Sequence, residues 1–232
     1  MTPFKYITDQ LPTNPTYDRG DLHSLTNELT AILDGIGGIK VIVYGTRVFA
    51  IDHHGSQKYG KLPYISHLDD TLLIGMAAYG NMLEHIPEDY LISLIIHDVL
   101  EDTKAREVDI KNHLGETTLQ ISKHVKNDDS LSREEKSIAL NKLLSKVDEK
   151  SEVGMGTLIV KMSDRFANMY RTLLDPTKVK LRARYWAELD DFLTAVTRAD
   201  SYIDMNIRAN HPNHCQVAYS NLYDALKEMG NR

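Results

Sequence analysis

Residues 91–102 read LISLIIHDVLED, an apolar run with four polar side chains among its last six positions. A proline just before the run favours a helix start, so we predict one helix over the whole stretch. Positions four apart share a face of a helix, which places His97 beside Glu101 and Asp98 beside Asp102. Like charges at this spacing destabilise a helix by roughly 0.2–0.5 kcal/mol per pair, and a bound cation would remove the repulsion. Because histidine and aspartate are suitable ligands for Mn²⁺, Fe²⁺ or Zn²⁺, the stretch predicts a metal site, although a His-Asp pair alone is common.

A second apolar stretch, residues 157–168 (TLIVKMSDRFAN), also carries polar side chains at helical spacing. Lys161, Asp164 and Asn168 share one face, and apolar residues surround that face as they would in a buried helix. A buried aspartate requires a cation or hydrogen-bond donors. The alternative is an exposed stripe in which Lys161 pairs with Asp164. A third candidate ligand, His67, opens a predicted helix after a loop rich in glycine and lysine, where a single histidine is also compatible with a structural role.

Helical spacing of apolar residues recurs along most of the chain and no alternating strand pattern persists, so we predict an all-α bundle. Residues 1–20 are rich in proline and are predicted to be irregular. The charge-dense stretch 126–136 is predicted to be a solvated loop and helix start. Residues 39–54 could begin as a strand, but we prefer a helix. The predicted helices cover residues 21–33, 39–54, 64–81, 87–102, 108–125, 157–174, 178–207 and 217–229, and the helix at 108–125 has a break at Gly115. A further helix starts at residue 132 and is separated from the helix at 157–174 by Gly154 and Gly156.

The chain of 232 residues has 42% hydrophobic and 26% charged residues, ordinary values for a globular protein. Its formal net charge of −6 disfavours extended nucleic acid as a partner, whereas a small phosphorylated ligand needs only a local basic cluster or a metal. The single cysteine, Cys215, rules out an internal disulfide, and the N-terminus lacks the apolar region of a signal peptide. No apolar run is long enough to span a bilayer, so we expect a cytoplasmic protein without membrane contact. The sequence leaves the oligomeric state open.

Three motifs of the chain belong together: His54-x-x-Gln57…Gly60…Pro63-Tyr64-Ile65-x-His67, His97-Asp98-Val99-x-Glu101-Asp102-Thr103 and Lys161-Met162-x-Asp164-Arg165-x-x-Asn168-Met169. Taken together they resemble the hydrolase domain of the RelA/SpoT family, which carries an HD-type metal site. The resemblance covers about residues 48–200, and the short, stand-alone metazoan homologues of SpoT look most similar.

The resemblance implies an HD-domain helical bundle and a hydrolytic function. One Mn²⁺, or another divalent transition metal, would be held by four side chains: His67, His97, Asp98 and Asp164. Glu101 and Asp102 would orient and deprotonate the attacking water. The substrate would be ppGpp or pppGpp, which would lose its 3′-pyrophosphate. The chemistry is coherent, because a metal lowers the pKa of bound water and a nearby carboxylate can act as general base.

The substrate-binding residues implied by the resemblance are Lys58, Lys61, Lys161, Asn168 and Arg171. The lysines could neutralise phosphate oxygens, and Asn168 could bind the ribose or support another residue of the site. The loop that carries the first two lysines is shorter than in the family and lacks the arginine expected near the base. One extra residue before Arg171 rotates it by about 100° on a helix relative to the family pattern. These departures concern substrate selection rather than metal binding.

The predicted organisation has an N-terminal extension of unknown role at residues 1–47, a phosphohydrolase domain at 48–200 and a C-terminal helical segment at 201–232 packed on that domain. Two other functions stay open. One is HD chemistry on another nucleotide, such as NADPH or a dNTP, which the altered loop motivates. The other is a catalytically silent module that binds a nucleotide, and the presence of every ligand and both acids argues against it.

Overall fold

The computed structural model describes residues 1–13, 15, 21–34, 36–197 and 214–232. Most of these residues are helical, which confirms the predicted all-α bundle. The only strands among them are β1 (Lys58–Tyr59) and β2 (Leu62–Pro63), which form one short antiparallel hairpin. None of the helices in the described ranges combines the length and the apolar character needed to cross a membrane.

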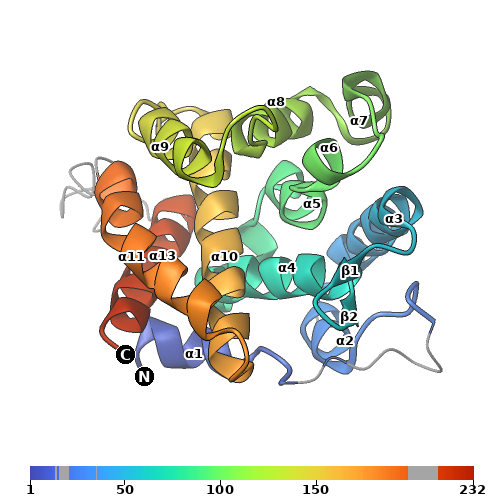
Figure 1. Cartoon of the computed structure of the whole chain (residues 1–232). Helices are drawn as coiled ribbons and strands as arrows, with labels where there is room; N and C mark the ends of the chain where they lie inside the picture. Colours follow the sequence, from blue (N-terminus) through green and yellow to red (C-terminus); the bar gives the residue numbers. More distant parts are fainter. Residues whose placement is uncertain (14, 16–20, 35, 198–213) are drawn as a thin grey trace.

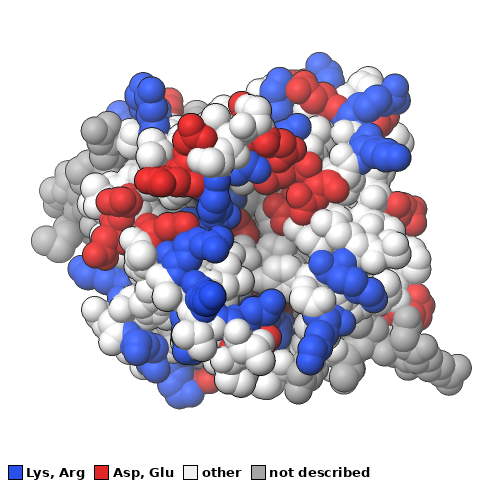
Figure 2. All heavy atoms as spheres, viewed as in Figure 1, with Lys and Arg blue, Asp and Glu red and all other residues white. Residues whose placement is uncertain are grey.

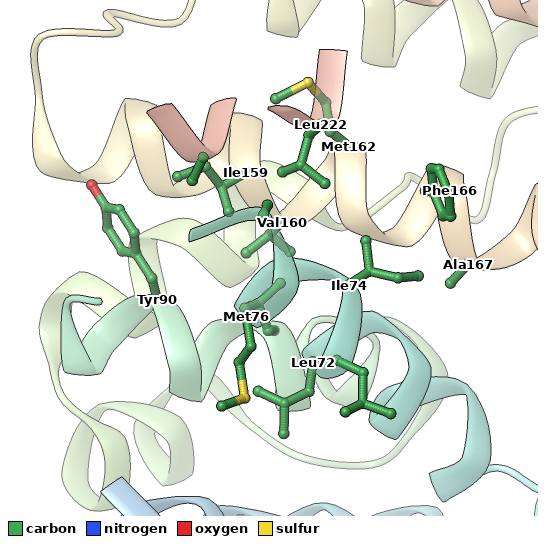
Figure 3. Packing of buried hydrophobic residues seen from close by; sticks show 14 of the residues in the cluster. Leu72, Ile74, Met76, Tyr90, Ile159, Val160, Met162, Phe166, Ala167 and Leu222 are labelled. Carbon is green, nitrogen blue, oxygen red and sulfur yellow. The ribbon is translucent and has the colours of Figure 1, made fainter. Parts of the chain in front are cut away.

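Two helices form the middle of the bundle (Figure 1), α4 (Ile65–Tyr79) and α10 (Glu152–Leu174). Every side chain of α4 is buried, as expected for a helix that is covered on all sides. Figure 3 shows the side chains of the two helices interleaving, among them Val160 and Ile74. Around this pair pack α5 (Glu88–Ile96), α8 (Glu116–Val125), α11 (Val179–Val196) and α13 (His214–Gly230).

The remaining helices cover the outside of this core. Helix α1 (Pro3–Asp9) packs on α13 and α4, and α3 (Gly37–His54) packs on α5 and α4, so the preference for a helix at residues 39–54 is confirmed. The division into three segments stays a prediction, and the predicted helical residues 198–207 lie outside the described ranges. The other peripheral elements are α2 (Asn27–Leu33), the 3₁₀ helix η2 (Gly80–His85), α6 (Val99–Asp102), α7 (Glu107–Leu114) and α9 (Arg133–Leu144).

The N-terminal residues contain a helix where an irregular lead was predicted. The Thr2 hydroxyl accepts a hydrogen bond from the Lys5 amide, and Pro3 occupies the first helical position, where its missing N–H costs nothing. Phe4 and Ile7 are buried on the core side of α1. The capping signals were present in the sequence, but tertiary burial of this short apolar face makes the helix stable.

The predicted break at Gly154 and Gly156 is also wrong, because both glycines lie inside α10. The helix begins one turn earlier, where the Ser151 hydroxyl accepts from the Gly154 amide. A Cβ on Gly156 would lie only 2.6 Å from Ile121 Cδ1 and 2.8 Å from Tyr90 Cε1. The missing side chain therefore permits close packing of α10 against α8 and α5 rather than ending a helix.

Candidate metal centre

Two helices and the junction between two others bring the four predicted ligands close together. His67 comes from the first turn of α4, Asp164 from the middle of α10, and His97 and Asp98 from the junction between α5 and α6. The two imidazoles are almost completely buried, and both carboxylates are largely covered. Figure 2 shows that acidic and basic side chains meet at a hollow near the centre of this face of the molecule.

The donor atoms of the four side chains are close neighbours. The Nε2 atoms of His67 and His97 lie 3.3 Å apart. Asp98 Oδ2 lies 3.4 Å and 3.1 Å from these two nitrogens, and Asp164 Oδ1 lies 3.3 Å and 3.7 Å from them. Metal–ligand bonds of about 2.0–2.2 Å place adjacent donors about 3.0–3.5 Å apart. The donor atoms of His67, His97 and Asp98 all lie within 4.8 Å of one another, and Asp164 adds a second carboxylate beside the two imidazoles. This donor set fits a divalent transition metal.

The predicted continuous helix is broken at His97 and Asp98, and the break aims the ligands. His97 Nδ1 lies 3.0 Å from the Leu94 carbonyl oxygen, which in an unbroken helix would accept from the Asp98 amide. Helix α5 accordingly ends at Ile96 and α6 begins at Val99. The carbonyl requires a proton on Nδ1, so the Nε2 lone pair faces the other ligands.

The charges of the cluster stabilise one another. Burial raises the pKa of Asp98, but His97 and His67 together bring it well below the usual range. Burial likewise raises the pKa of Asp164, and Lys161 and His67 outweigh that effect. For His67, burial lowers the pKa, yet hydrogen bonds to Asp164 and Asp98 raise it to about 10. The two carboxylates thus stay ionised and create a site that attracts positive charge.

The two candidate catalytic acids lie beside the cluster and are held differently. Glu101 accepts from the Asn127 backbone amide at 2.8 Å and from its side-chain amide at 3.1 Å. Asp102 Oδ2 accepts from the Tyr64 hydroxyl at 2.8 Å and from Gln57 Nε2 at 3.2 Å. The Asp102 amide donates to the Asp98 carbonyl at 2.8 Å, so the expected one-turn relation between these two aspartates survives the break.

Not all of the predicted substrate-binding residues lie at the candidate metal centre. Lys161 Nζ lies 2.8 Å from Asp164 Oδ2, and Asn168 donates to the Asp164 carbonyl at 3.0 Å. Lys58 and Lys61 are exposed on the β1–β2 hairpin. Arg171 instead pairs with a buried aspartate of α4, so its role in substrate binding stays a prediction.

A basic pocket next to Asp164 was missed at the level of sequence. It is open to solvent and spans about 470 Å³ including the space at its mouth. Four cationic side chains line it: Arg133, Lys136, Lys161 and Arg165. The prediction of a solvated loop and helix start at residues 126–136 is confirmed. The signal for a pocket within that stretch is a pair of cations spaced three apart at the start of α9, on the same face of that helix.

Comparison with known proteins establishes the fold. No family model and no curated protein matches the chain. Among solved structures, the chain is similar to one described as a metazoan ortholog of SpoT that hydrolyzes ppGpp and plays a role in starvation responses. The TM-score is 0.54 and the sequence identity 17%, and the match covers 83% of this chain and 93% of that chain. It is also similar to lmo0812 from Listeria monocytogenes EGD-e, with a TM-score of 0.50, 16% identity, and coverage of 73% and 97%. The resemblance to the SpoT type of HD-domain hydrolase is therefore confirmed at the level of the fold.

Proposed function

We propose that this protein is a metal-dependent phosphohydrolase whose single divalent ion, Mn²⁺, is held by His67, His97, Asp98 and Asp164. The observation that carries the proposal is that the two imidazole Nε2 atoms lie 3.3 Å apart and each lies 3.1–3.7 Å from a carboxylate oxygen of both aspartates. An ordinary structural cluster would not need two buried imidazoles that point their Nε2 atoms at two ionised carboxylates.

The chain's own residues supply the remaining parts of a hydrolytic site. When bound, the metal would lower the pKa of a coordinated water and offset charge on the attacked phosphate. Asp102 lies one turn beyond Asp98 and is the general base in this proposal, held by Tyr64 and Gln57. Glu101 is fixed by two donors of Asn127 and orients the water.

The basic pocket would receive the leaving pyrophosphate. Its cations are now shared with carboxylates: Arg133 and Arg165 both pair with Glu188, and Lys161 pairs with Asp164. A phosphate group can exchange with the pair of Arg133, whose side chain is 49% exposed, because exposed ion pairs are weak. Lys161 and Arg165 are buried and would add positive charge from the wall of the pocket. The exposed Lys58 and Lys61 of the hairpin are proposed to contact phosphate oxygens at the rim.

For the substrate we propose ppGpp or pppGpp, which loses its 3′-pyrophosphate. Three motifs of the chain support this choice, and so does the likeness of its fold to a protein described as hydrolyzing ppGpp. We expect no binding of extended nucleic acid, given the net charge of −6.

The test is a panel of nucleotides incubated with the purified full chain and Mn²⁺. We expect ppGpp to yield GDP and pyrophosphate, and chelation of the metal to stop the reaction. Hydrolysis of NADPH or dNTPs with ppGpp left intact would overturn the substrate and keep the reaction class. If the wild type and the Asp102→Asn variant both bind ppGpp and are equally inert, the protein is a nucleotide-binding module and the enzymatic proposal fails.

A further inference from the structure

The β1–β2 hairpin and the residue that follows it place two tyrosines against the candidate metal centre. The Tyr64 hydroxyl lies 2.7 Å from Asp98 Oδ2 and 2.8 Å from Asp102 Oδ2. A phenol has one proton and an ionised carboxylate can only accept, so the two carboxylates share that proton, which links a proposed metal ligand to the proposed general base. Its position fixes the distance between these two carboxylates.

The orientation of the Tyr64 ring is itself fixed. The ring stacks on His54, with centroids 4.3 Å apart and an interplanar angle of 15°. His54 Nδ1 lies 2.8 Å from Gln57 Oε1, and the same amide group donates to Asp102. These contacts form a closed ring of interactions in which Tyr64 and Asp102 are each held from two sides.

Tyr59 acts on the other two ligands. Its ring stacks on the His67 imidazole, with centroids 4.6 Å apart and an interplanar angle of 16°. Its hydroxyl donates to Asn168 Oδ1 at 2.9 Å, and Asn168 Nδ2 donates to the carbonyl and the carboxylate of Asp164. Asn168 Oδ1 also accepts from Tyr185 at 3.4 Å, so both amide hydrogens and both lone pairs of Asn168 are already used.

The hairpin holds the two tyrosines in a fixed relation to each other. Tyr59 pairs with Leu62, and Gly60 adopts φ +63°, a conformation that favours glycine and turns the chain tightly. The Tyr64 amide donates to the Gln57 carbonyl at 3.1 Å and closes the base of the hairpin. One small structural unit therefore contacts His67 of α4 and Asp98 of the α5–α6 junction directly, and it reaches Asp164 of α10 through Asn168.

We propose that Tyr59 and Tyr64 are positioning residues, which fix His67 and Asp164 on one side and Asp98 and Asp102 on the other in the arrangement that binds the metal. The inference rests on the proposed function only in taking these side chains as ligands. Asn168 then serves to orient Asp164 rather than to contact substrate. Partners of this kind orient ligands, and their loss weakens metal affinity by about 10–100-fold.

The experiment removes each hydroxyl while keeping the ring, with Tyr59→Phe and Tyr64→Phe. Metal-free full chain is titrated with Mn²⁺ in competition with a chelating indicator, without any nucleotide. We expect each variant to bind Mn²⁺ about 10–100-fold more weakly than wild type. The matched control is Tyr79→Phe at the far end of α4, where the hydroxyl contacts only Cys215 Sγ at 3.4 Å among the described partners, and its Mn²⁺ affinity should stay within twofold of wild type.

Two further readouts separate positioning from general loss of structure. Thermal unfolding of the metal-free variants should match the control, because the rings and their stacking are retained. With ppGpp as substrate, Tyr64→Phe should lower kcat more than it raises KM. Mn²⁺ affinities of both variants within twofold of wild type overturn the inference, as does a wild type that binds no Mn²⁺. If wild type binds Mn²⁺ and the variants bind it weakly while no nucleotide is cleaved, the inference stands and the proposed function fails.

Discussion

Replacing Arg171 by methionine tests whether this residue anchors the fold or contacts substrate. The Arg171 guanidinium lies 2.6 Å from Asp70 Oδ1 through Nη2, contacts the other carboxylate oxygen through Nε, and donates to the Thr13 carbonyl at 3.1 Å. The side chains of the pair are only 10% and 2% exposed. Arg171→Met therefore leaves a buried carboxylate without its partner.

The expected loss of stability is large. Breaking a buried ion pair by removing one partner costs about 3–5 kcal/mol. For a chain of this size, each kcal/mol corresponds to roughly 2–4 °C in the unfolding midpoint, so Tm should fall by roughly 6–20 °C. The double variant Asp70→Asn, Arg171→Met should lose less than the sum of the two single variants, because no unpaired charge remains.

The pH dependence gives a second signature. Burial raises the pKa of Asp70, and Arg171 pulls it back toward its ordinary value. Without Arg171 the pKa rises further, so the folded protein binds a proton that the unfolded chain has released. Stability then falls as pH rises through this window, by up to about 1.4 kcal/mol per pH unit. Arg171→Met should thus be more destabilised at pH 8 than at pH 5.5.

Urea unfolding followed by circular dichroism, together with steady-state kinetics, decides the question. The control is Lys123→Met, which removes an exposed ion pair with Glu107 and should change the free energy of unfolding by less than about 1 kcal/mol. If Arg171→Met is as stable as this control and instead raises KM for ppGpp, the residue is a substrate contact and the reasoning is refuted.

Gly75→Ala would place a Cβ 2.4 Å from Leu94 Cδ1 and should lower the free energy of unfolding in urea by about 1–3 kcal/mol. The control Gly38→Ala, whose Cβ would have no atom within 4 Å, should not destabilise the protein. Equal stabilities of the two variants would refute this account of the α4–α5 contact. Asp102→Asn should lower kcat by about 10²–10⁴-fold and keep Mn²⁺ bound, as read by metal analysis, and undiminished turnover would exclude it as general base. Chelation should lower Tm, and Mn²⁺ at 100 times its Kd should restore about 2.7 kcal/mol of stability by calorimetry; a Tm that ignores Mn²⁺ would argue against the site.

The sequence by itself determined the helical class of the fold and the nomination of the four candidate ligands. Helical periodicity is a local property, so apolar spacing along residues 91–102 and 157–168 was enough to predict buried helices that carry polar side chains. The resemblance of the motifs containing His67, Asp98 and Asp164 to the RelA/SpoT family then implied the full set of ligands, whose donor types suit one metal. None of this required knowledge of how the helices pack.

Only the tertiary structure decided how those donors meet and what supports them. The break at His97 depends on a side-chain bond to Leu94, and the partnership of Arg171 with Asp70 joins residues about a hundred positions apart. The closeness of Tyr59 to His67 and the gathering of cations around Asp164 likewise depend on the packing of separate helices. Such contacts follow from the crossing angles of the helices and from burial across the whole core. Local spacing does not encode them, because the partner of one helix face depends on where all the other helices pack.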